Sequence, residues 1–483
     1  MNIAELNINF ASITPALILI VTALIVMLVD AFSKEGRTTP LSFLSLLGVI
    51  LAALSAIMLS RTTHEGFSGM ITHDGLAAFG TFAVCIGAAI TLLVSNRDLS
   101  NHQMRQGEYF TLMLLATSGM AFLMSASDLV MFFLGLELMS IPIYALAGFN
   151  RRSLRSGESA MKYFVLGAFA TGLLLYGTAL IYGAVGSTNY ADIAATVSEI
   201  GLTGNLYLTI GTALILVALG FKVGAVPFHM WVPDVYQGAP TSITGFMGAA
   251  VKAAGFVALA RLVFVVFVDA AEVLTPLLWA LAAVTMIVGN ILALVQSNVK
   301  RMLAYSSVSH AGFLLVAIVV GTSGALSALL FYLIVYAVAN LGAFAATIAI
   351  SGSEDAEDIE TWAGVSTRRP FVAFAMMLCM LSLAGIPPTA GFLGKFYLFK
   401  EAIEAGFVYL ALVAVIASVI GVYYYLRVIV FMYMKEGAAG VQTGTRDMAL
   451  NIGLVITSVA IAFFGILPNW LLEVARNSVI DLF

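Results

Sequence analysis

Charge is scarce in this chain of 483 residues. Only 10% of the residues are Asp, Glu, Lys or Arg, 61% are hydrophobic, and the mean hydropathy is +1.03. This composition excludes an ordinary soluble domain and indicates a polytopic membrane protein. The formal net charge of −4 is too small to indicate any partner, nucleic acid included.

The chain also lacks the residues that redox cofactors and nucleotides require. Its two cysteines, Cys85 and Cys379, lie in apolar runs, whereas an iron–sulfur cluster needs about four thiolates. There is no P-loop, no GxGxxG after a strand, and no HxxxH or clustered ligand set for a metal. We therefore expect no cofactor and no metal in this chain, and any energy it uses must come from an ion gradient or a partner.

Long apolar runs are what the chain has instead. Runs of about 17–25 residues, the length at which a helix crosses a bilayer, predict an all-α protein with about fourteen transmembrane helices. The predicted spans are 12–32, 41–59, 76–94, 109–124, 129–149, 161–185, 206–231, 243–268, 277–295, 302–320, 325–350, 371–399, 405–433 and 450–466. Because MNIAELNIN lacks a basic n-region, we expect the first span to be an anchor rather than a cleaved signal peptide.

The basic residues of the loops lie mainly on one side of the predicted membrane. With the N-terminus outside, thirteen fall in inner loops and three in outer loops, so the positive-inside rule places both termini outside. The inner residues are Lys34, Arg37, Arg97, Arg105, Arg151, Arg152, Arg155, Lys300, Arg301, Arg368, Arg369, Lys435 and Arg446, and the outer ones are Arg61, Lys400 and Arg476.

Charges near span ends have simpler expected roles. Lys162, Arg261 and Arg427 lie within about seven residues of a span end, so we expect their side chains to snorkel to the headgroups. The segment SGSEDAEDIETW (351–362) contains five carboxylates and is expected to be a solvated loop.

Four ionisable residues lie deep inside apolar runs. They are one carboxylate, Glu137, and three lysines, Lys222, Lys252 and Lys395. A charge at bilayer depth costs several kcal/mol, so such residues usually line a polar path. Desolvation disfavours the charged form of a lysine, and a carboxylate nearby restores it. Moving Glu137 relative to a lysine would therefore change the affinity of that lysine for a proton; the alternative is a static ion pair that only fixes helix packing.

Three further residues are candidates for a proton relay. His229 follows Lys222 by seven residues, so the two are expected to share a helix face if the helix is not strongly distorted there. His310 lies in AYSSVSHAGF with Tyr305 and several serines, and imidazole is the natural proton shuttle near neutral pH. The alternative for each histidine is a satisfied packing role.

Proline interrupts two of the predicted spans. In GFKVGAVPFHMW, Lys222 precedes Pro227, and in LAGIPPTAGFLGKFY, two prolines precede Lys395. These are spans 7 and 12, so spans 4–8 and 9–13 are predicted to form two five-helix repeats, the second inverted because five is odd. Alternatively, the breaks are coincidental, since membrane helices often contain Pro and Gly. Spans 9–13 have no acidic residue except near their ends, so we expect Lys395 to lack a carboxylate partner.

This organisation divides the chain into four segments. The predicted segments are an N-terminal three-helix segment (1–108), the first repeat (109–272), the inverted second repeat (273–433) and a C-terminal helix (434–483).

The segment GFKVGAVPFHMWVPDVYQGAPTSITGF (220–246) resembles the signature of the antiporter-like membrane subunits of respiratory complex I, NADH:quinone oxidoreductase. Mrp-type cation/proton antiporter subunits are related to them. The stretches 132–146, 298–313 and 381–399 also match, and the resemblance covers essentially the whole chain. Subunit N is the most similar, because of DVYQGAP (234–240), of Lys395 where subunit M typically has glutamate, and of the short C-terminus where subunit L has a lateral helix.

The resemblance implies a proton-translocating subunit of an oxidoreductase whose NADH, FMN, iron–sulfur clusters and quinone belong to other subunits. In the family, the carboxylate of helix 5 pairs with the lysine of broken helix 7, the lysine of helix 8 is a central relay, and helix 12 connects to one side. On matching motifs these roles fall to Glu137, Lys222, Lys252 and Lys395, and His229 and His310 also match family positions.

The implied surroundings are the adjacent antiporter-like subunit M, the small subunits K, J and A, and the lipid of a bacterial inner membrane. Two other functions stay open: a subunit of an Mrp-type Na⁺/H⁺ antiporter, and a structural membrane scaffold.

Overall fold

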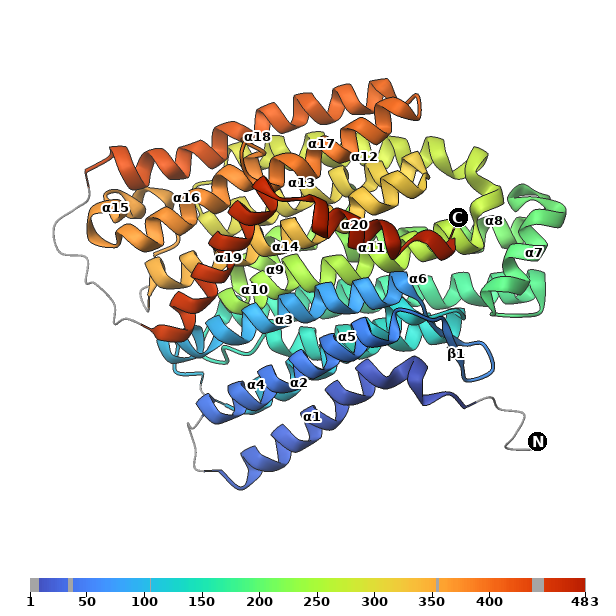
Figure 1. The fold of residues 1–483 in the computed structure, drawn as a ribbon, viewed down its shortest axis with the longest axis horizontal. Coiled ribbons are helices and arrows are strands. Elements are labelled where there is room, and N and C mark those ends of the chain that lie inside the picture. Colours follow the sequence, from blue (N-terminus) through green and yellow to red (C-terminus); the bar gives the residue numbers. More distant parts are fainter. Residues whose placement is uncertain (1–7, 34–37, 105, 353–355, 437–446, 483) are drawn as a thin grey trace.

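Long helices lying side by side make up most of the computed structural model (Figure 1). It describes residues 8–33, 38–104, 106–352, 356–436 and 447–482. Within these ranges, thirteen helices are long and apolar enough to cross a membrane. The predicted all-α polytopic fold is therefore confirmed, and a two-stranded hairpin is the one sheet in the described part of the chain.

The N-terminal segment contains three long helices and the hairpin. Its elements are η2 (Phe10–Ile13), α1 (Thr14–Ala31), α2 (Thr38–Leu59), β1 (His64–Gly66), β2 (Ile71–His73) and α3 (Gly75–Asn101). The strands are antiparallel, with His64 opposite His73. Asp74 directly follows β2 and begins α3, because its side chain accepts a hydrogen bond from the Ala77 amide at 2.9 Å.

The first predicted repeat contains one interrupted span. Its helices are α4 (Glu108–Ser125), α5 (Leu129–Ala147), α6 (Leu154–Val185), α7 (Tyr190–Ile200), η3 (Leu202–Gly204), α8 (Leu206–Val223), α9 (Trp231–Gly238), α10 (Thr241–Phe246), η4 (Met247–Val251), α11 (Lys252–Arg261), η5 (Leu262–Val266) and η6 (Val268–Ala270). The span predicted at 206–231 is broken between α8 and α9, because Gly224 adopts a left-handed conformation (φ 75°) that ends α8. The segments η4 and η5 are π-helical turns on either side of α11.

The second predicted repeat has the same interruption. Its helices are α12 (Ala271–Leu294), α13 (Val299–Val320), α14 (Ser323–Ser351), η7 (Ile359–Trp362), α15 (Val365–Arg368), α16 (Pro370–Ala384), α17 (Ala390–Glu404) and α18 (Val408–Met434). Gly385 ends α16 in the left-handed conformation (φ 80°), so both predicted helix breaks are confirmed. The chain then continues with α19 (Met448–Ile466), α20 (Asn469–Asn477) and η8 (Ile480–Leu482).

The two five-helix groups pack in the same way, which supports the predicted repeats. The helix α4 packs against α5 as α12 packs against α13, and α6 contacts both α8 and α9 as α14 contacts both α16 and α17. The first pair comes closest at Gly119, where an added Cβ would lie 2.2 Å from the Met139 nitrogen. The corresponding glycine of the second pair is Gly289, where it would lie 2.5 Å from the Ser309 nitrogen.

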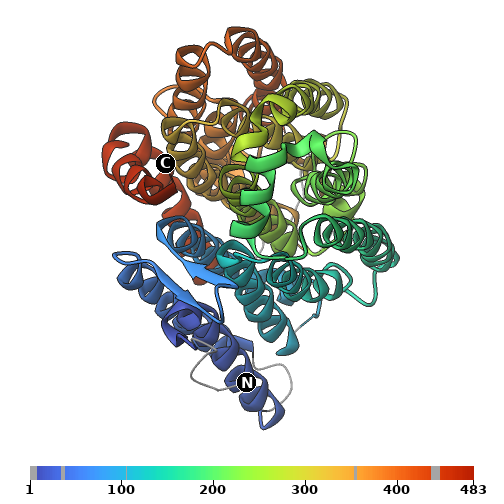
Figure 2. The same ribbon diagram turned by 90° about the vertical axis from the view of Figure 1, so that its right-hand side faces the viewer.

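The helix α14 forms the centre of the molecule. It contacts α3, α10, α13, α16, α17, α19 and α20, and its side chains are buried from Ala325 to Ala349. Figure 2, which shows most helices nearly end-on, places the N-terminal helices and the C-terminal helices on neighbouring flanks of this core. Buried side chains on α14 can therefore reach both repeats.

The loops gather at two ends, as the predicted alternation of spans requires. Isolated bridges join Ile71 to Ala126 and Asp128 to Asn189, all in segments predicted outside. At the other end Asn298 pairs with Asp358, in segments predicted inside. Lys34, Arg37, Arg105 and Arg446 lie outside the described residues.

The expectation of a solvated acidic loop at 351–362 holds for Asp358 and Glu360, which are exposed, but is wrong for Glu357. Glu357 is 8% exposed and forms an ion pair with Lys300, with an N–O distance of 3.1 Å. The indole of Trp362 is buried and donates a hydrogen bond to the Ala356 carbonyl at 2.8 Å. Residues 353–355 lie outside the described residues.

Candidate proton-transfer site

Lys222 lies at the end of α8 and is 6% exposed. Its Nζ donates hydrogen bonds to the Ser140 hydroxyl at 2.8 Å and the Tyr163 hydroxyl at 3.4 Å. Glu137 lies on α5, one turn before Ser140, is half-buried, and accepts a hydrogen bond from Thr171 at 2.7 Å. Among the described residues, Lys222 has no carboxylate oxygen within 4.0 Å. The structure therefore holds the two charges apart, and Ser140 is the hydroxyl that contacts Lys222 from the helix of Glu137.

Lys252 is the first residue of α11 and directly follows the π-helical turn η4. It is 4% exposed, and its Nζ donates a hydrogen bond to the Ser307 carbonyl and lies 5.8 Å from the centre of the Tyr336 ring. A π-helical turn interrupts the regular hydrogen bonding of an α-helix and is frequent at functional sites. Lys252 thus faces α13 and α14 from the first repeat.

His310 is the centre of a hydrogen-bonded cluster in the second repeat. Its Nδ1 lies 2.6 Å from the Tyr332 hydroxyl, and its Nε2 lies 3.0 Å from the Tyr425 hydroxyl. The Tyr425 hydroxyl is in turn 2.5 Å from the Ser306 hydroxyl. Both Lys252 and Lys395 interact electrostatically with His310. The His310 ring lies 4.7 Å from the ring of Tyr336, over which Lys252 lies, and 5.8 Å from the ring of Phe313, over which Lys395 lies.

Lys395 lies on α17, after the helix break, and is 5% exposed. Its Nζ donates hydrogen bonds to the carbonyls of Leu383 at 3.0 Å and Ala384 at 3.1 Å, and to the Ser418 hydroxyl at 3.0 Å. These carbonyls lie at the end of α16, where a helix leaves its last carbonyls without partners and attracts cations. Each of these hydrogen-bond partners is uncharged, as the scarcity of acidic residues in spans 9–13 predicts.

Two predicted relay residues lie apart from these clusters. The expectation that His229 shares a helix face with Lys222 is wrong, because α8 ends at Val223 and His229 lies in the turn before α9. Tyr305 is half-buried, and its ring lies 5.9 Å from the guanidinium carbon of Arg301, near the start of α13. The two nitrogens of His310 are instead bound by Tyr332 and Tyr425.

Sequence reasoning did not find the hydroxyl groups that bind these charged side chains. Tyr332 and Tyr336 are separated by one turn of α14, and Asn340 follows after one more, so the three share one face. That i, i+4 repetition of polar side chains in an apolar run was the available signal. Ser140 carried no comparable signal, since a single serine in a membrane helix is ordinary.

The snorkelling interpretation is wrong for Arg261. It is 3% exposed, forms an ion pair with Asp74 at 2.6 Å, and donates to the Met124 carbonyl at 2.8 Å. Burial alone would raise the pKa of Asp74, but the charge and hydrogen bond of Arg261 hold that pKa below its usual value.

Lys162 and Arg427 also have protein partners. Lys162 pairs with Glu158 at 2.6 Å and Asp234 at 2.8 Å, and Arg427 donates to the Leu294 carbonyl at 3.1 Å. The protein thus binds all three of the basic side chains that were expected to snorkel. Across the described residues, no three or more His, Cys, Asp or Glu side chains are grouped as metal ligands.

Comparison with known proteins identifies the family. Residues 126–421 match the family described as "NADH:quinone oxidoreductase/Mrp antiporter, TM". NADH-quinone oxidoreductase subunit N of Trichlorobacter lovleyi is 44% identical over 482 residues, which cover 99% of both chains. The chain belongs to the NADH-quinone oxidoreductase subunit N family. A subunit N from Chloroflexus aggregans is 40% identical and covers 97% of both chains.

Solved structures show how widely this fold is shared. A chain of respiratory complex I from Thermus thermophilus is 33% identical, with a TM-score of 0.80 over 95% of this chain and 98% of that one. A chain of the Mrp complex from Dietzia has a TM-score of 0.87 over 98% of both chains, but is 22% identical and so shows the fold alone. It is therefore the sequence, and not the fold, that separates the subunit N family from the antiporters.

Proposed function

We propose that this chain is the proton-translocating subunit N of an NADH:quinone oxidoreductase, and that protons cross it through a buried relay of Glu137, Lys222, Lys252 and Lys395. The observation that carries the proposal is the set of three buried lysines, each hydrogen-bonded in the described structure to uncharged oxygens. An ammonium group held this way can lose its proton without leaving a carboxylate unpaired.

The contacts suggest a role for each residue. Glu137 and Lys222 form the switch, because they lie near each other without a direct ion pair and Ser140 contacts Lys222. Lys252 is the relay between the repeats, and His310 connects it to Lys395. Lys395 exchanges protons with the adjoining subunit or the far side of the membrane. His229 and Tyr305 are additional relay candidates outside this cluster.

The rest of the enzyme supplies the energy. NADH, FMN, the iron–sulfur clusters and the quinone would be bound by other subunits, since this chain has two buried cysteines and no nucleotide-binding motif. We further propose that subunits M, K, J and A are its neighbours in a bacterial inner membrane, with both termini outside. Within the chain, 109–272 and 273–433 would be the inverted repeats.

Two alternative functions make different predictions. A subunit of an Mrp-type antiporter would give a sodium-dependent pH gradient, but identity to subunit N relatives at 40–44% exceeds that to the Mrp chain at 22%. A structural scaffold would keep full activity after loss of the buried charges. The variant that tests the relay also tests the scaffold alternative.

The deciding variant is Lys222→Ala in the assembled enzyme. Loss of the proton-carrying group should lower NADH-driven proton pumping in inverted membrane vesicles by roughly tenfold or more, the scale of a missing acid–base group. Subunit content, measured on the purified complex, should stay at the wild-type level.

The matched control is Lys400→Ala, which removes a lysine whose side chain is 46% exposed and pairs with Glu404. It should pump as the wild type does. An assembled Lys222→Ala enzyme with normal pumping would rule out the proposed relay.

A further inference from the structure

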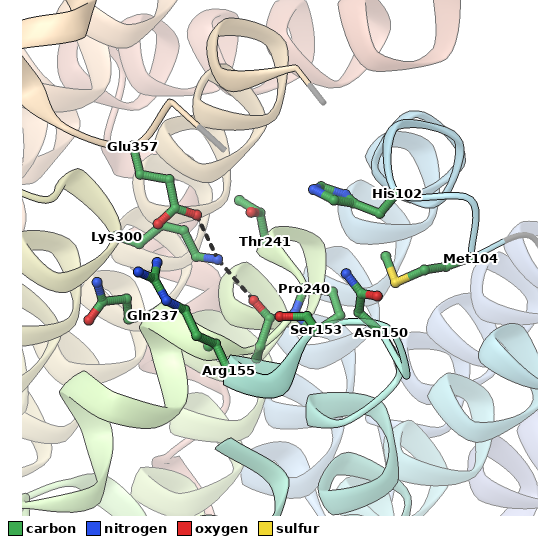
Figure 3. Close-up of a pocket in the computed structure, with 12 residues that line it drawn as sticks. His102, Met104, Asn150, Ser153, Arg155, Gln237, Pro240, Thr241, Lys300 and Glu357 are labelled. Atoms are coloured by element: carbon green, nitrogen blue, oxygen red, sulfur yellow. Dashed lines mark hydrogen bonds and ion pairs between the residues drawn. The ribbon is translucent and has the colours of Figure 1, made fainter. Parts of the chain in front are cut away.

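A polar cavity of about 50 Å³ opens at the end of the molecule that carries the predicted inner loops (Figure 3). On one side the buried Lys300 pairs with Glu357 and donates to the Ala239 carbonyl at 2.9 Å. His102 lies across the cavity from this pair, with Thr241 between them. The volume is sufficient for a few water molecules, and the lining supplies the polar partners they need.

A chain of hydrogen bonds leads inward from His102. The Nδ1 of its imidazole lies 3.1 Å from the main-chain carbonyl oxygen of Asp98 and 3.4 Å from the carboxylate of the same residue. This carboxylate is 1% exposed and accepts hydrogen bonds from the Ser242 amide and hydroxyl at 2.8 and 2.6 Å. The Ser242 hydroxyl lies 2.8 Å from that of Tyr109, which lies 2.8 Å from that of Ser95. The sequence did not predict a buried charge on α3. The relay described above gives the buried carboxylate of Asp98 no role.

The membrane span made of α10, η4 and α11 connects these hydrogen-bonded residues with Lys252. Thr241 begins α10 at the cavity wall, and Lys252 follows eleven residues later, about 16 Å along the helix. Near Lys252 the amide nitrogen of Asn340 is buried and has no hydrogen-bond partner among the residues that the structure describes. Asn340 packs directly against Gly248, one turn before Lys252. Buried polar atoms of this kind are normally satisfied by ordered water.

We propose that this cavity is the entrance for protons from the inner side, with His102 as the first acceptor. The imidazole takes a proton from water in the cavity and passes one on through Asp98 and Ser242. Water ordered by Asn340 then carries a proton to Lys252. The inference rests on the proposed function, because it names the source of the protons that the relay moves.

The test is chemical rescue of His102→Ala by free imidazole. NADH:quinone turnover is measured in inverted vesicles with an uncoupler present, so that the imidazole does not act through the pH gradient. Turnover should fall roughly tenfold, and millimolar imidazole in the medium should restore most of it, because a small base can replace a lost proton donor at a water-filled cavity. A structural role of His102 would not be rescued.

The control is His64→Ala, on the hairpin at the opposite end, which should match the wild type with and without imidazole. If His102→Ala fails to assemble, His102→Gln, which can still reach Asp98, is tested in the same way. Wild-type turnover, or a loss that imidazole does not relieve, overturns the entrance. Failure of the relay is seen separately, as normal pumping by Lys222→Ala.

Discussion

The buried lysines differ in what holds their ammonium groups. The Nζ of Lys395 is bound by two main-chain carbonyls and a serine hydroxyl, whereas that of Lys222 is bound by two side-chain hydroxyls. A carbonyl can only accept a hydrogen bond, while a hydroxyl can turn and donate to a neutral amine. Both hydroxyls at Lys222 can therefore turn to serve either protonation state, whereas at Lys395 only the Ser418 hydroxyl can do so. This difference makes Lys395 the more informative residue to alter.

For Lys395, arginine and glutamate should have opposite effects. Lys395→Arg keeps donors for the two carbonyls but holds a charge that cannot be released near neutral pH. Lys395→Glu keeps a group that can gain and lose a proton. At equal assembly, we expect the arginine variant to pump worse than the glutamate variant in membrane vesicles. The reverse order would mean that this position supplies a fixed positive charge.

At this scale the sequence reveals the charges that lie inside apolar runs, but neither the charges that other parts of the chain bury nor the contacts that any of them make. Glu137 and the three lysines stand out because a charge in an apolar run is a local signal. Tyr332 and Tyr425, which bind His310, come from helices far apart in the chain, so no local pattern joins them. Arg261 was misassigned for the same reason. Its distance from a span end does not show that Asp74, which is far away in the chain, forms an ion pair with it.

Among the elements, the helix breaks were the most predictable feature. Glycine and proline act on their own backbone, so the breaks after Val223 and Ala384 follow from a few adjacent residues. The direction of the chain after a break depends on tertiary packing. That is why His229 was placed on the helix of Lys222, when it lies in the turn.

The close contact of α4 with α5 can be tested at Gly119. An alanine there would place a methyl group against the backbone of Met139, next to Ser140, so Gly119→Ala should destabilise the complex by about 1–3 kcal/mol. Gly172→Ala on α6 is the control, since nothing lies within 4 Å of the added methyl group. Thermal unfolding of the purified complex should show a lower midpoint for Gly119→Ala alone. Equal midpoints would show that the helices can separate at no cost.

In the whole molecule, the ion pair of Arg261 and Asp74 joins parts that are distant in the chain. Asp74 caps α3 of the N-terminal segment, and Arg261 ends α11 of the first repeat and also binds the carbonyl at the end of α4. Breaking such a buried pair costs about 3–5 kcal/mol, because one charge is left without its partner.

The stability that Asp74 contributes should depend on pH in the opposite sense in the Arg261→Gln variant. In the wild type the pKa of Asp74 is lowered, so its contribution to stability is complete above the ordinary value of about 3.9 and is lost only below it. Without Arg261, burial raises that pKa, so the variant should become more stable as the pH falls from neutral towards 5. Burial lowers the pKa of the adjacent His73, so protonation of that imidazole would oppose this gain as the pH falls.

Thermal midpoints of the purified complex at several pH values check this reversal. The second substitution Asp74→Asn should recover part of the loss, because asparagine also caps helices. A variant whose stability does not change with pH would show that Asp74 is satisfied by other groups.

The two hydroxyls that hold His310 would also limit how often the proposed relay can operate. Each ring nitrogen faces one tyrosine, so a proton that arrives from Tyr332 at Nδ1 leaves from Nε2 towards Tyr425. The ring is then left in the opposite tautomer, with both tyrosine hydroxyls turned the wrong way. A second proton cannot follow in the same direction until ring and hydroxyls have turned back. The His310 cluster would thus pass protons singly, with a resting interval after each one.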